Sequence, residues 1–253
     1  MKRAFEFVDE KSQKFWWIET SENKFVVNYG KIDTIGKYEI KEWDSVEECE
    51  KQATKLINSK IRKGYKEVNF DYNNHYYFDD MEYDIDFLTS HPNFREHFTD
   101  EQLYCNCGDE ETPVGSDTGN DVLHIIEEKI RKNKNFSFVD FPKYLLEKEW
   151  GIEYFEPILI TDEKVFAEEL KIKDKGLSRE AIINESDEVV IATAFAQIKI
   201  TGKIDEELKE KALLSLKRVE LIAKICGYGE SEINKQLYND LESFTNKENI
   251  KLN

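Results

Sequence analysis

The sequence has few cysteines and no long apolar run. Its four cysteines are too few and too scattered along 253 residues for a disulfide-stapled fold, so we expect reduced thiols. No stretch approaches the ~18 consecutive apolar residues of a membrane span, and the first residues lack the apolar core of a signal peptide. These absences predict a cytoplasmic protein that does not associate with membranes.

The sequence also lacks familiar catalytic motifs. It contains no G-x-x-x-x-G-K-[ST], no G-x-G-x-x-G after a strand, no G-x-S-x-G and no H-E-x-x-H. Its four histidines have no identifiable Ser or Cys partner. We therefore expect a non-enzymatic protein without a cofactor.

Metal-ligand spacing is weak as well. Cys105 and Cys107 form a lone C-x-C, whereas structural zinc sites usually draw on paired C-x-x-C or H-x-x-x-H spacing. The neighbouring Asp109, Asp117 and Asp121 do not follow the spacing of a calcium-binding loop. The prediction is that no metal is bound, with a Cys/His or Asp-rich site as the alternative.

Positive charge is scarce in one part of the chain. The net charge is −17, but residues 1–68 are nearly neutral with 14 Lys/Arg and 13 Asp/Glu, whereas residues 69–121 hold one base, Arg95, and 14 acids. Such asymmetry predicts two units with different surfaces. We place the first domain at residues 1–70 and an acidic second domain at residues 75–253.

The first domain has the pattern of an antiparallel sheet with one helix. Residues 4–8, 15–19, 24–29 and 37–43 are rich in aromatic and β-branched residues and are separated by short polar turns. Ser45, with Glu48 three residues later, is a helix-start signature before an apolar stripe at helical spacing, and Gly64 supplies a stop.

These residues resemble the WGR domain, a module of poly(ADP-ribose) polymerases and of bacterial proteins of the MolR and YfeS type. The resemblance rests on Lys14-Phe15-Trp16 with Ile18, on Tyr29-Gly30-Lys31-Ile32, on Gly36, and on a closing helix with Lys60, Gly64 and Tyr65. It covers about residues 1–68 and implies a sheet with one packed helix.

The resemblance also implies a nucleic-acid contact, because the polymerase modules bind DNA near strand breaks. Tyr29 takes the position of the motif Trp and keeps an aromatic face for stacking. Lys31 takes the position of the motif Arg and keeps its charge without the bidentate fork. The candidate nucleic-acid-binding residues are Tyr29, Gly30, Lys31 and Lys37.

The residues alone allow two interpretations of the basic positions in this domain. Lysines on or between the strands, interleaved with Tyr29, Tyr38 and Trp43, fit a surface that tracks phosphates. The alternative is a solvated sheet face, with cations stabilising a helix C-terminus. The basic residues concerned are Lys24, Lys31, Lys37, Lys41, Lys55, Lys60, Arg62, Lys63 and Lys66.

Residues 71–88 alternate aromatics with acids. One interpretation is a docking strip for a basic protein, with Tyr76, Tyr77, Asp79 and Asp80 as its contact residues. The favoured interpretation is a boundary segment whose aromatics enter the core while its acids face water.

The second domain reads as mainly helical. Residues 112–123 resemble a short signature of uncharacterised YfeS-like proteins, and Asp117 or Asp121 is expected to cap a helix that begins near Asp121. Further helices are predicted at 141–150, from 161 or 162 to about 170, from 205 to 226 and from 231 to about 245. Residues 187–200 are apolar nearly all round and predict a central buried helix that ends at Gly202.

The sequence therefore predicts an α+β protein, namely a sheet with one packed helix followed by a mainly helical domain. The leading hypothesis is a bacterial, non-enzymatic binding protein whose first domain contacts a nucleic-acid backbone or DNA ends. The alternative is a protein–protein adaptor or regulatory protein that uses the acidic aromatic segment.

Overall fold

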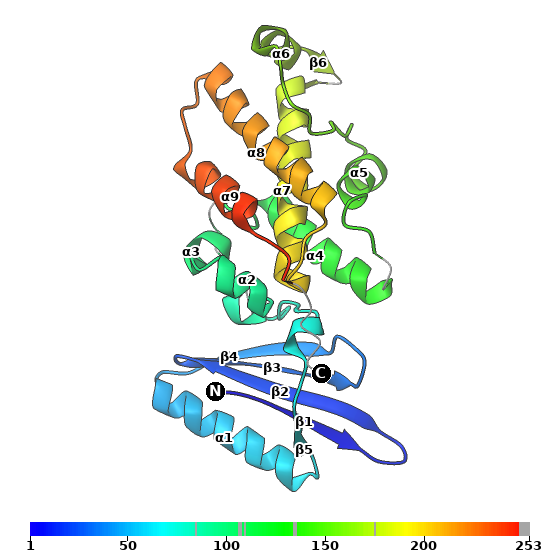
Figure 1. Cartoon of the computed structure of the whole chain (residues 1–253), viewed down its shortest axis with the longest axis vertical. Coiled ribbons are helices and arrows are strands. Elements are labelled where there is room, and N and C mark those ends of the chain that lie inside the picture. The colour runs from blue at the N-terminus through cyan, green and yellow to red at the C-terminus, as the bar shows by residue number, and fades with distance from the viewer. Residues whose placement is uncertain (84, 106–107, 109, 134–135, 175, 248–253) are drawn as a thin grey trace. The chain divides into compact units, whose positions relative to one another are not determined.

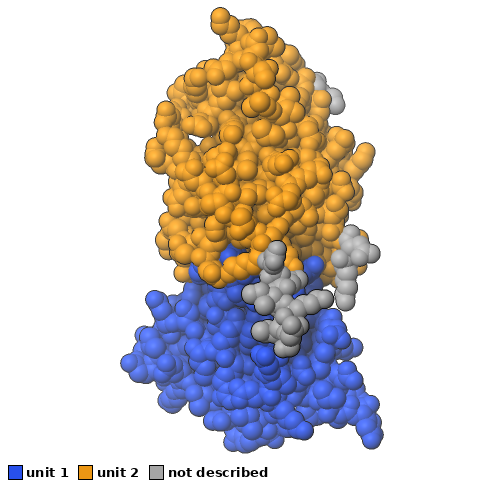
Figure 2. Space-filling model, viewed as in Figure 1, with its two compact units in different colours: residues 1–95 blue, residues 96–253 orange. Residues whose placement is uncertain are grey.

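The computed structural model describes residues 1–83, 85–105, 108, 110–133, 136–174 and 176–247. The chain divides into two compact units, Met1–Arg95 and Glu96–Asn253 (Figure 2).

Unit 1 is built on a five-stranded antiparallel sheet with the order β4-β3-β2-β1-β5 (Figure 1). The first four strands follow the predicted segments, and the short fifth strand was not predicted. Their bounds are β1 (Lys2–Val8), β2 (Gln13–Ser21), β3 (Lys24–Lys31), β4 (Lys37–Glu42) and β5 (Lys66–Val68). The α+β prediction is confirmed.

One amphipathic helix, α1 (Val46–Arg62), packs on one face of this sheet. Ser45 caps it as predicted, because its side chain accepts a hydrogen bond from the backbone N–H of Glu48. The core beneath the helix brings strand residues together with Cys49, Ala53 and Ile57 of the helix. The strand residues of this core are Phe5, Trp16, Ile18, Phe25 and Val27.

The opposite face of the sheet is covered by the segment that follows β5. Tyr77 and Phe78 are fully buried, and the ring of Tyr77 packs 5.9 Å from the rings of both Trp17 and Tyr38. The prediction that the aromatics of residues 71–88 enter the core is confirmed at these positions. Two short 3₁₀ turns, η1 (Tyr72–Asn74) and η2 (Phe87–Thr89), lie in this segment.

The prediction that the acids of this segment face water is wrong for Asp79, Asp80 and Asp86, which are almost fully buried. Each carboxylate accepts hydrogen bonds inside unit 1. Asp80 accepts from the backbone N–H of Ile40 at 2.9 Å, and Asp86 pairs with Lys24 at 2.6 Å. Since Ile40 lies on the edge strand β4, Asp80 satisfies a donor that would otherwise be exposed at the sheet edge.

The compact unit extends to Arg95, beyond residue 70, where the sequence placed the end of the first domain. Arg95 forms a two-pronged ion pair with Glu19 of β2, with distances of 2.9 and 3.0 Å. Burial raises the pKa of Glu19, and the Arg95 and Lys2 cations more than offset this effect, so that its pKa is lowered overall. The segment after residue 70 is thus tied to the sheet by charge as well as by rings.

Unit 2 is mainly helical, as predicted. Its central helix α7 is buried nearly all round and packs against α4, α5, α6 and α8 (Figure 1). The helix bounds are α3 (Glu101–Tyr104), α4 (Asp117–Lys132), α5 (Phe141–Tyr144) with a π-helical turn at Leu145–Trp150, α6 (Glu163–Leu170), α7 (Arg179–Thr201), α8 (Glu206–Cys226) and α9 (Glu232–Ser243). A two-stranded hairpin, β6 (Lys173–Asp174) and β7 (Leu177–Ser178), precedes α7, and α2 (Pro92–His97) spans the division between the units.

Helix α4 begins earlier than predicted. Its cap is Ser116, whose hydroxyl accepts from the backbone N–H of Gly119, so neither Asp117 nor Asp121 is the cap. Asp117 lies in the first turn, where a carboxylate is stabilised by the helix dipole. The hydroxyl therefore takes the role that the sequence assigned to a carboxylate.

A buried ion pair joins α7 to α8. The Arg218 guanidinium donates two hydrogen bonds to the Asp187 carboxylate, both at 2.8 Å. It also donates to the backbone carbonyls of Phe155 and Glu156.

No described helix is long and apolar enough to cross a membrane.

Candidate nucleic-acid interface

The alternation of side chains along the strands gathers cations on the face that carries α1. Lys14 of β2 pairs across the sheet with Lys31 of β3, and Tyr29 pairs with both Trp16 and Lys37. Trp16 belongs to the core under α1, so Lys14, Lys31 and Lys37 share its face.

The last turn of α1 adds a lysine that is surrounded by aromatic rings. The Lys60 ammonium lies 5.2 Å from the ring centroids of Trp16 and Tyr65 and 5.8 Å from that of Tyr29. These distances fit cation–π attraction. Burial lowers the pKa of Lys60, and the neighbouring cations Lys63 and Lys14 lower it further.

We call the group formed by Lys14, Lys31, Lys60 and Lys63, together with the rings of Tyr29 and Tyr65, the basic corner. Within the part of the chain that the structure describes, none of its four lysines makes an ion pair. Lys14, Lys31 and Lys63 are exposed, and Lys60 is half-buried. A concentration of uncompensated cations next to aromatic faces is the arrangement that nucleic-acid backbones favour.

Tyr29 and Lys37, two predicted site residues, are partly engaged inside the protein. The Tyr29 hydroxyl donates to Glu39 at 2.5 Å, and the same carboxylate oxygen pairs with Lys37 at 3.1 Å. The hydrogen bond to Glu39 raises the pKa of Tyr29. Tyr29 is half-buried, so part of it remains accessible to solvent. Lys37 pairs with Glu39, whereas Lys31 makes no ion pair among the described residues.

Gly30, also a predicted site residue, allows a close approach of two backbone segments. A Cβ at Gly30 would lie 2.9 Å from the Cα of Gly36, closer than side chains tolerate. Gly36 has a φ of +78° and lies against the ring of Phe15. The two glycines therefore let the β3–β4 connection fold back tightly next to Lys31.

A buried amide fixes this connection to the sheet. The Asn28 side chain donates to the backbone carbonyls of Ile35 and Lys37 at 3.0 and 3.2 Å, and its Oδ1 lies 2.9 Å from Nε2 of His75. Burial lowers the pKa of His75 to about 4, so the imidazole is neutral at neutral pH and donates to Asn28. The connection between Lys31 of β3 and Lys37 of β4 is thus fixed to the sheet by the Asn28 side chain.

Sequence reasoning missed part of this site and overestimated another part. It did not include Lys14 among the basic residues, although period-two alternation along β2 would have placed Lys14 on the same face as Trp16. It included Lys24, which is instead paired with the buried carboxylate of Asp86 on the opposite face.

The residues of the alternative docking strip are mostly inaccessible. Tyr77, Asp79 and Asp80 have exposed fractions of 0%, 3% and 6%, whereas Tyr76 is exposed at 37%. The backbone carbonyl of Tyr76 accepts a hydrogen bond from the hydroxyl of Tyr38. Three of the four named contact residues of the strip therefore belong to the buried part of unit 1.

Candidate metal ligands are not brought together in the described part of the chain, where no group of three or more His, Cys, Asp or Glu side chains could hold an ion. Cys107 and Asp109 lie outside the described residues. Cys105 is therefore not part of such a group among the described residues.

Comparison with known proteins agrees with this geometry. The family model of the WGR domain matches residues 1–71. The chain is 43% identical over 248 residues to the uncharacterised protein YfeS of Escherichia coli K12, which covers 96% of this chain and 98% of YfeS. It is 38% identical over 65 residues to the protein YehF of the same organism, covering 26% of this chain and 24% of YehF.

A crystal structure of a protein from Bacteroides fragilis is 29% identical and covers 51% of this chain and 39% of that chain, with a TM-score of 0.27. The similarity to YfeS extends over nearly the full length of both chains, and the WGR match coincides with the sheet and helix that carry the basic corner. The chain therefore belongs to the YfeS family and carries a WGR domain at its N-terminus.

Proposed function

We propose that the WGR domain of this chain binds the phosphate backbone of nucleic acid through the basic corner. The observation that carries the proposal is the set of four lysines from β2, β3 and the end of α1, which make no ion pair in the described residues. One of them, Lys60, lies against the half-buried rings of Tyr29 and Tyr65. Phosphate oxygens would complete the coordination of these ammonium groups.

The shape of the site supports a backbone contact rather than recognition of base sequence. The site offers lysine ammonium groups, which act as point charges and lack the bidentate geometry that recognises a base edge. Tyr29 and Tyr65 provide ring faces against which a sugar or an unstacked end base could lie. This chemistry suits a DNA end or a nick, where the terminal base is easily unstacked.

The buried acids of unit 1 support the same proposal. Asp79, Asp80 and Asp86 belong to the face of the sheet opposite α1, and their carboxylates accept hydrogen bonds or pair with Lys24. Three of the 14 acids that the sequence places at residues 69–121 therefore lie on the face of the sheet opposite the basic corner.

Fluorescence anisotropy of the full chain with intact, nicked and 5′-phosphorylated-end duplexes tests this proposal. We expect Lys31→Ala to weaken binding several-fold on all three probes. Lys41→Ala is the matched control, because Lys41 is exposed on the same face but lies four residues beyond Lys37 along β4, about 13 Å away. Absent binding at low salt, or equal losses in the two variants, would reject the proposal.

A further inference from the structure

Unit 2 contains a cavity of about 360 Å³ between α7, α8, α9 and the loop of residues 110–113. Its floor is apolar, because Ile191 of α7, Leu216 and Ile222 of α8 and Leu237 of α9 contribute buried side chains. The volume falls in the range of about 300–1,000 Å³ that is typical of small-molecule sites. The polar side chains of the cavity lie on its rim, and the floor supplies none.

The rim carries charge of one sign. Its charged side chains are Glu110, Glu111, Glu188 and Glu230, and no Lys, Arg or His is among the described residues that line the cavity. Glu188 accepts a hydrogen bond from the Ser116 hydroxyl, and Glu111 accepts one from Ser231. The Ser116 hydroxyl is a neutral donor and does not offset the negative charge of Glu188.

Among the rim carboxylates, Glu230 pairs with Lys235 at 2.5 Å. Glu110 and Glu188 make no ion pair in the described part of the chain. Burial raises the pKa of Glu188, and the negative charges of Glu185 and Glu110 raise it further. A cation in the cavity would relieve this repulsion.

We propose that this cavity binds a small organic cation, an alkylamine whose ammonium group is held between the carboxylates of Glu110 and Glu188 while its alkyl chain lies on the apolar floor. An ammonium group donates three hydrogen bonds, and charge-assisted bonds to carboxylates are stronger than neutral ones. The apolar floor selects against fully hydrated inorganic cations, because its side chains supply no ligands to replace the water shell.

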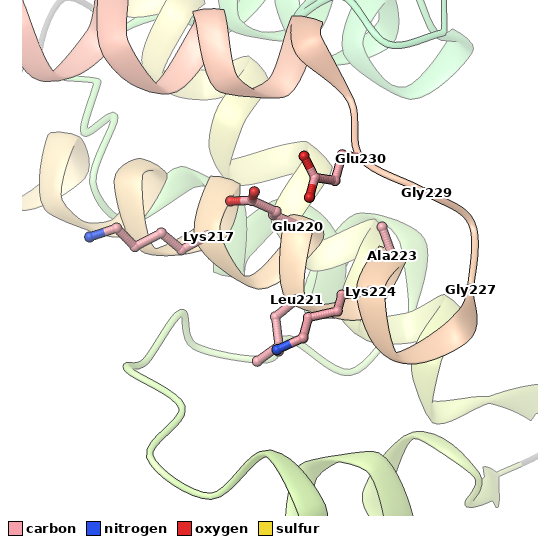
Figure 3. A pocket seen from close by; sticks show the side chains of 8 residues that line it. All are labelled: Lys217, Glu220, Leu221, Ala223, Lys224, Gly227, Gly229 and Glu230. Atoms are coloured by element: carbon pink, nitrogen blue, oxygen red, sulfur yellow. The ribbon is translucent and has the colours of Figure 1, made fainter.

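A second hollow, of about 540 Å³, lies along α8 and the α8–α9 connection and serves as an internal comparison (Figure 3). It is lined by Lys217 and Lys224 as well as by Glu220 and Glu230, so its charges have both signs. Figure 3 shows Lys217, Glu220 and Lys224 along α8, and Glu230 on the connection that follows it. This hollow has no preference for a cation and only Leu221 and Ala223 as apolar side chains.

Isothermal titration calorimetry of the full chain at low salt with hexylamine tests the proposal, with 1-hexanol as an uncharged probe of similar shape. We expect saturable binding of hexylamine with one site per chain and at least tenfold weaker binding of 1-hexanol. Glu188→Gln is expected to weaken hexylamine binding about tenfold or more, and Glu110→Gln several-fold. The matched control is Glu210→Gln, since Glu210 is exposed on α8 and does not line the cavity.

Each outcome decides the question. Absence of saturable hexylamine binding would overturn the proposal, and so would equal affinity for 1-hexanol or an equal loss in Glu210→Gln. If Glu188→Gln fails to fold, Glu110→Gln decides, because Glu110 is exposed and its substitution leaves the core intact. Unchanged affinity in folded Glu110→Gln and Glu188→Gln would place the amine elsewhere and refute the assignment.

Discussion

Replacing Asn28 by Ala should destabilise unit 1 because this one amide organises the β3–β4 connection. The substitution removes three hydrogen bonds, with distances of 3.0, 3.2 and 2.9 Å, and leaves the carbonyls of Ile35 and Lys37 without this donor. At about 1 kcal/mol for each bond, the free energy of unfolding should fall by about 3 kcal/mol. The site is fully buried, so water cannot easily replace the amide.

Urea unfolding followed by tryptophan fluorescence measures this loss, because Trp16, Trp17 and Trp43 are three of the four tryptophans and all lie in unit 1. With a urea dependence of about 2 kcal/mol per molar, the midpoint should move down by about 1.5 M. The control is Asn58→Ala at an exposed position of α1, which should change stability by no more than about 0.5 kcal/mol. A loss below about 1 kcal/mol for Asn28→Ala would refute the reasoning.

A second substitution, Asn28→Asp, tests the same site through the pH dependence of stability. A carboxylate accepts but does not donate, so it would face two carbonyl oxygens and only the His75 imidazole would remain as a donor. A neighbouring negative charge should raise the pKa of His75 above its present value of about 4. The Asp variant should therefore be less unstable, relative to wild type, near pH 5 than near pH 8.

Three further predictions concern other parts of the structure. The pKa of His75 is about 4 in the folded state and about 6.5 in the unfolded state, so the unfolded chain takes up the proton first. The free energy of unfolding should therefore fall by about 3 kcal/mol as the pH drops from about 6.5 to about 4. Urea midpoints should change less across this pH range in His75→Gln than in wild type, and an equal change in both would contradict the assignment. Gly30→Ala should lower stability by about 1–3 kcal/mol in urea unfolding, because the new methyl group would meet the Gly36 backbone at 2.9 Å, and an unchanged midpoint would show that the loop yields freely. Asp187→Asn should destabilise unit 2 by about 3–5 kcal/mol, because it leaves Arg218 buried without its counter-charge. Replacing both residues with apolar ones of similar volume should recover much of this loss. Calorimetric melting of wild type and the two variants measures the difference, and an equal loss in the double variant would contradict this prediction.

Much of the fold could be predicted because its signals are local. The strands show aromatic and β-branched residues between polar turns, Ser45 marks the start of α1, and residues 187–200 lack a polar face because α7 is buried all round. Gly202, in a left-handed conformation, ends α7 as predicted. These features depend on residues within one or two turns of each other.

The segment after β5 could not be predicted in the same way because its partners are distant in sequence. Asp80 resembles a surface acid in the sequence, yet its carboxylate accepts from the Ile40 N–H on an edge strand that it meets only in the folded unit. The two 3₁₀ turns and β5 are likewise too short to show a hydrophobic period in the sequence. The alternation of acids and aromatics therefore predicted the buried rings correctly but placed in water the acids Asp79, Asp80 and Asp86, which the structure buries.

The candidate site was predicted only in part, because some of its contacts also join residues that are distant in sequence. The motif positions Tyr29, Gly30 and Lys31 are contiguous and recognisable from sequence. The enclosure of Lys60 by three rings depends on how the end of α1 crosses β2 and β3, which no local pattern reports. The ion pair between Lys37 and Glu39 follows from their positions two residues apart on one face of β4.

The salt dependence of binding to a nicked duplex tests the central claim most directly. Anisotropy titrations at several salt concentrations give the slope of log affinity against log salt, which reports the number of phosphates neutralised, at about 0.9 for each contact. The basic corner predicts a steep slope for the wild-type chain, reduced by about 1 in Lys31→Ala and by about 2 in a Lys14→Ala, Lys31→Ala double variant, with no change in Lys41→Ala. A slope near zero, or one that falls as much in Lys41→Ala as in Lys31→Ala, would contradict the account.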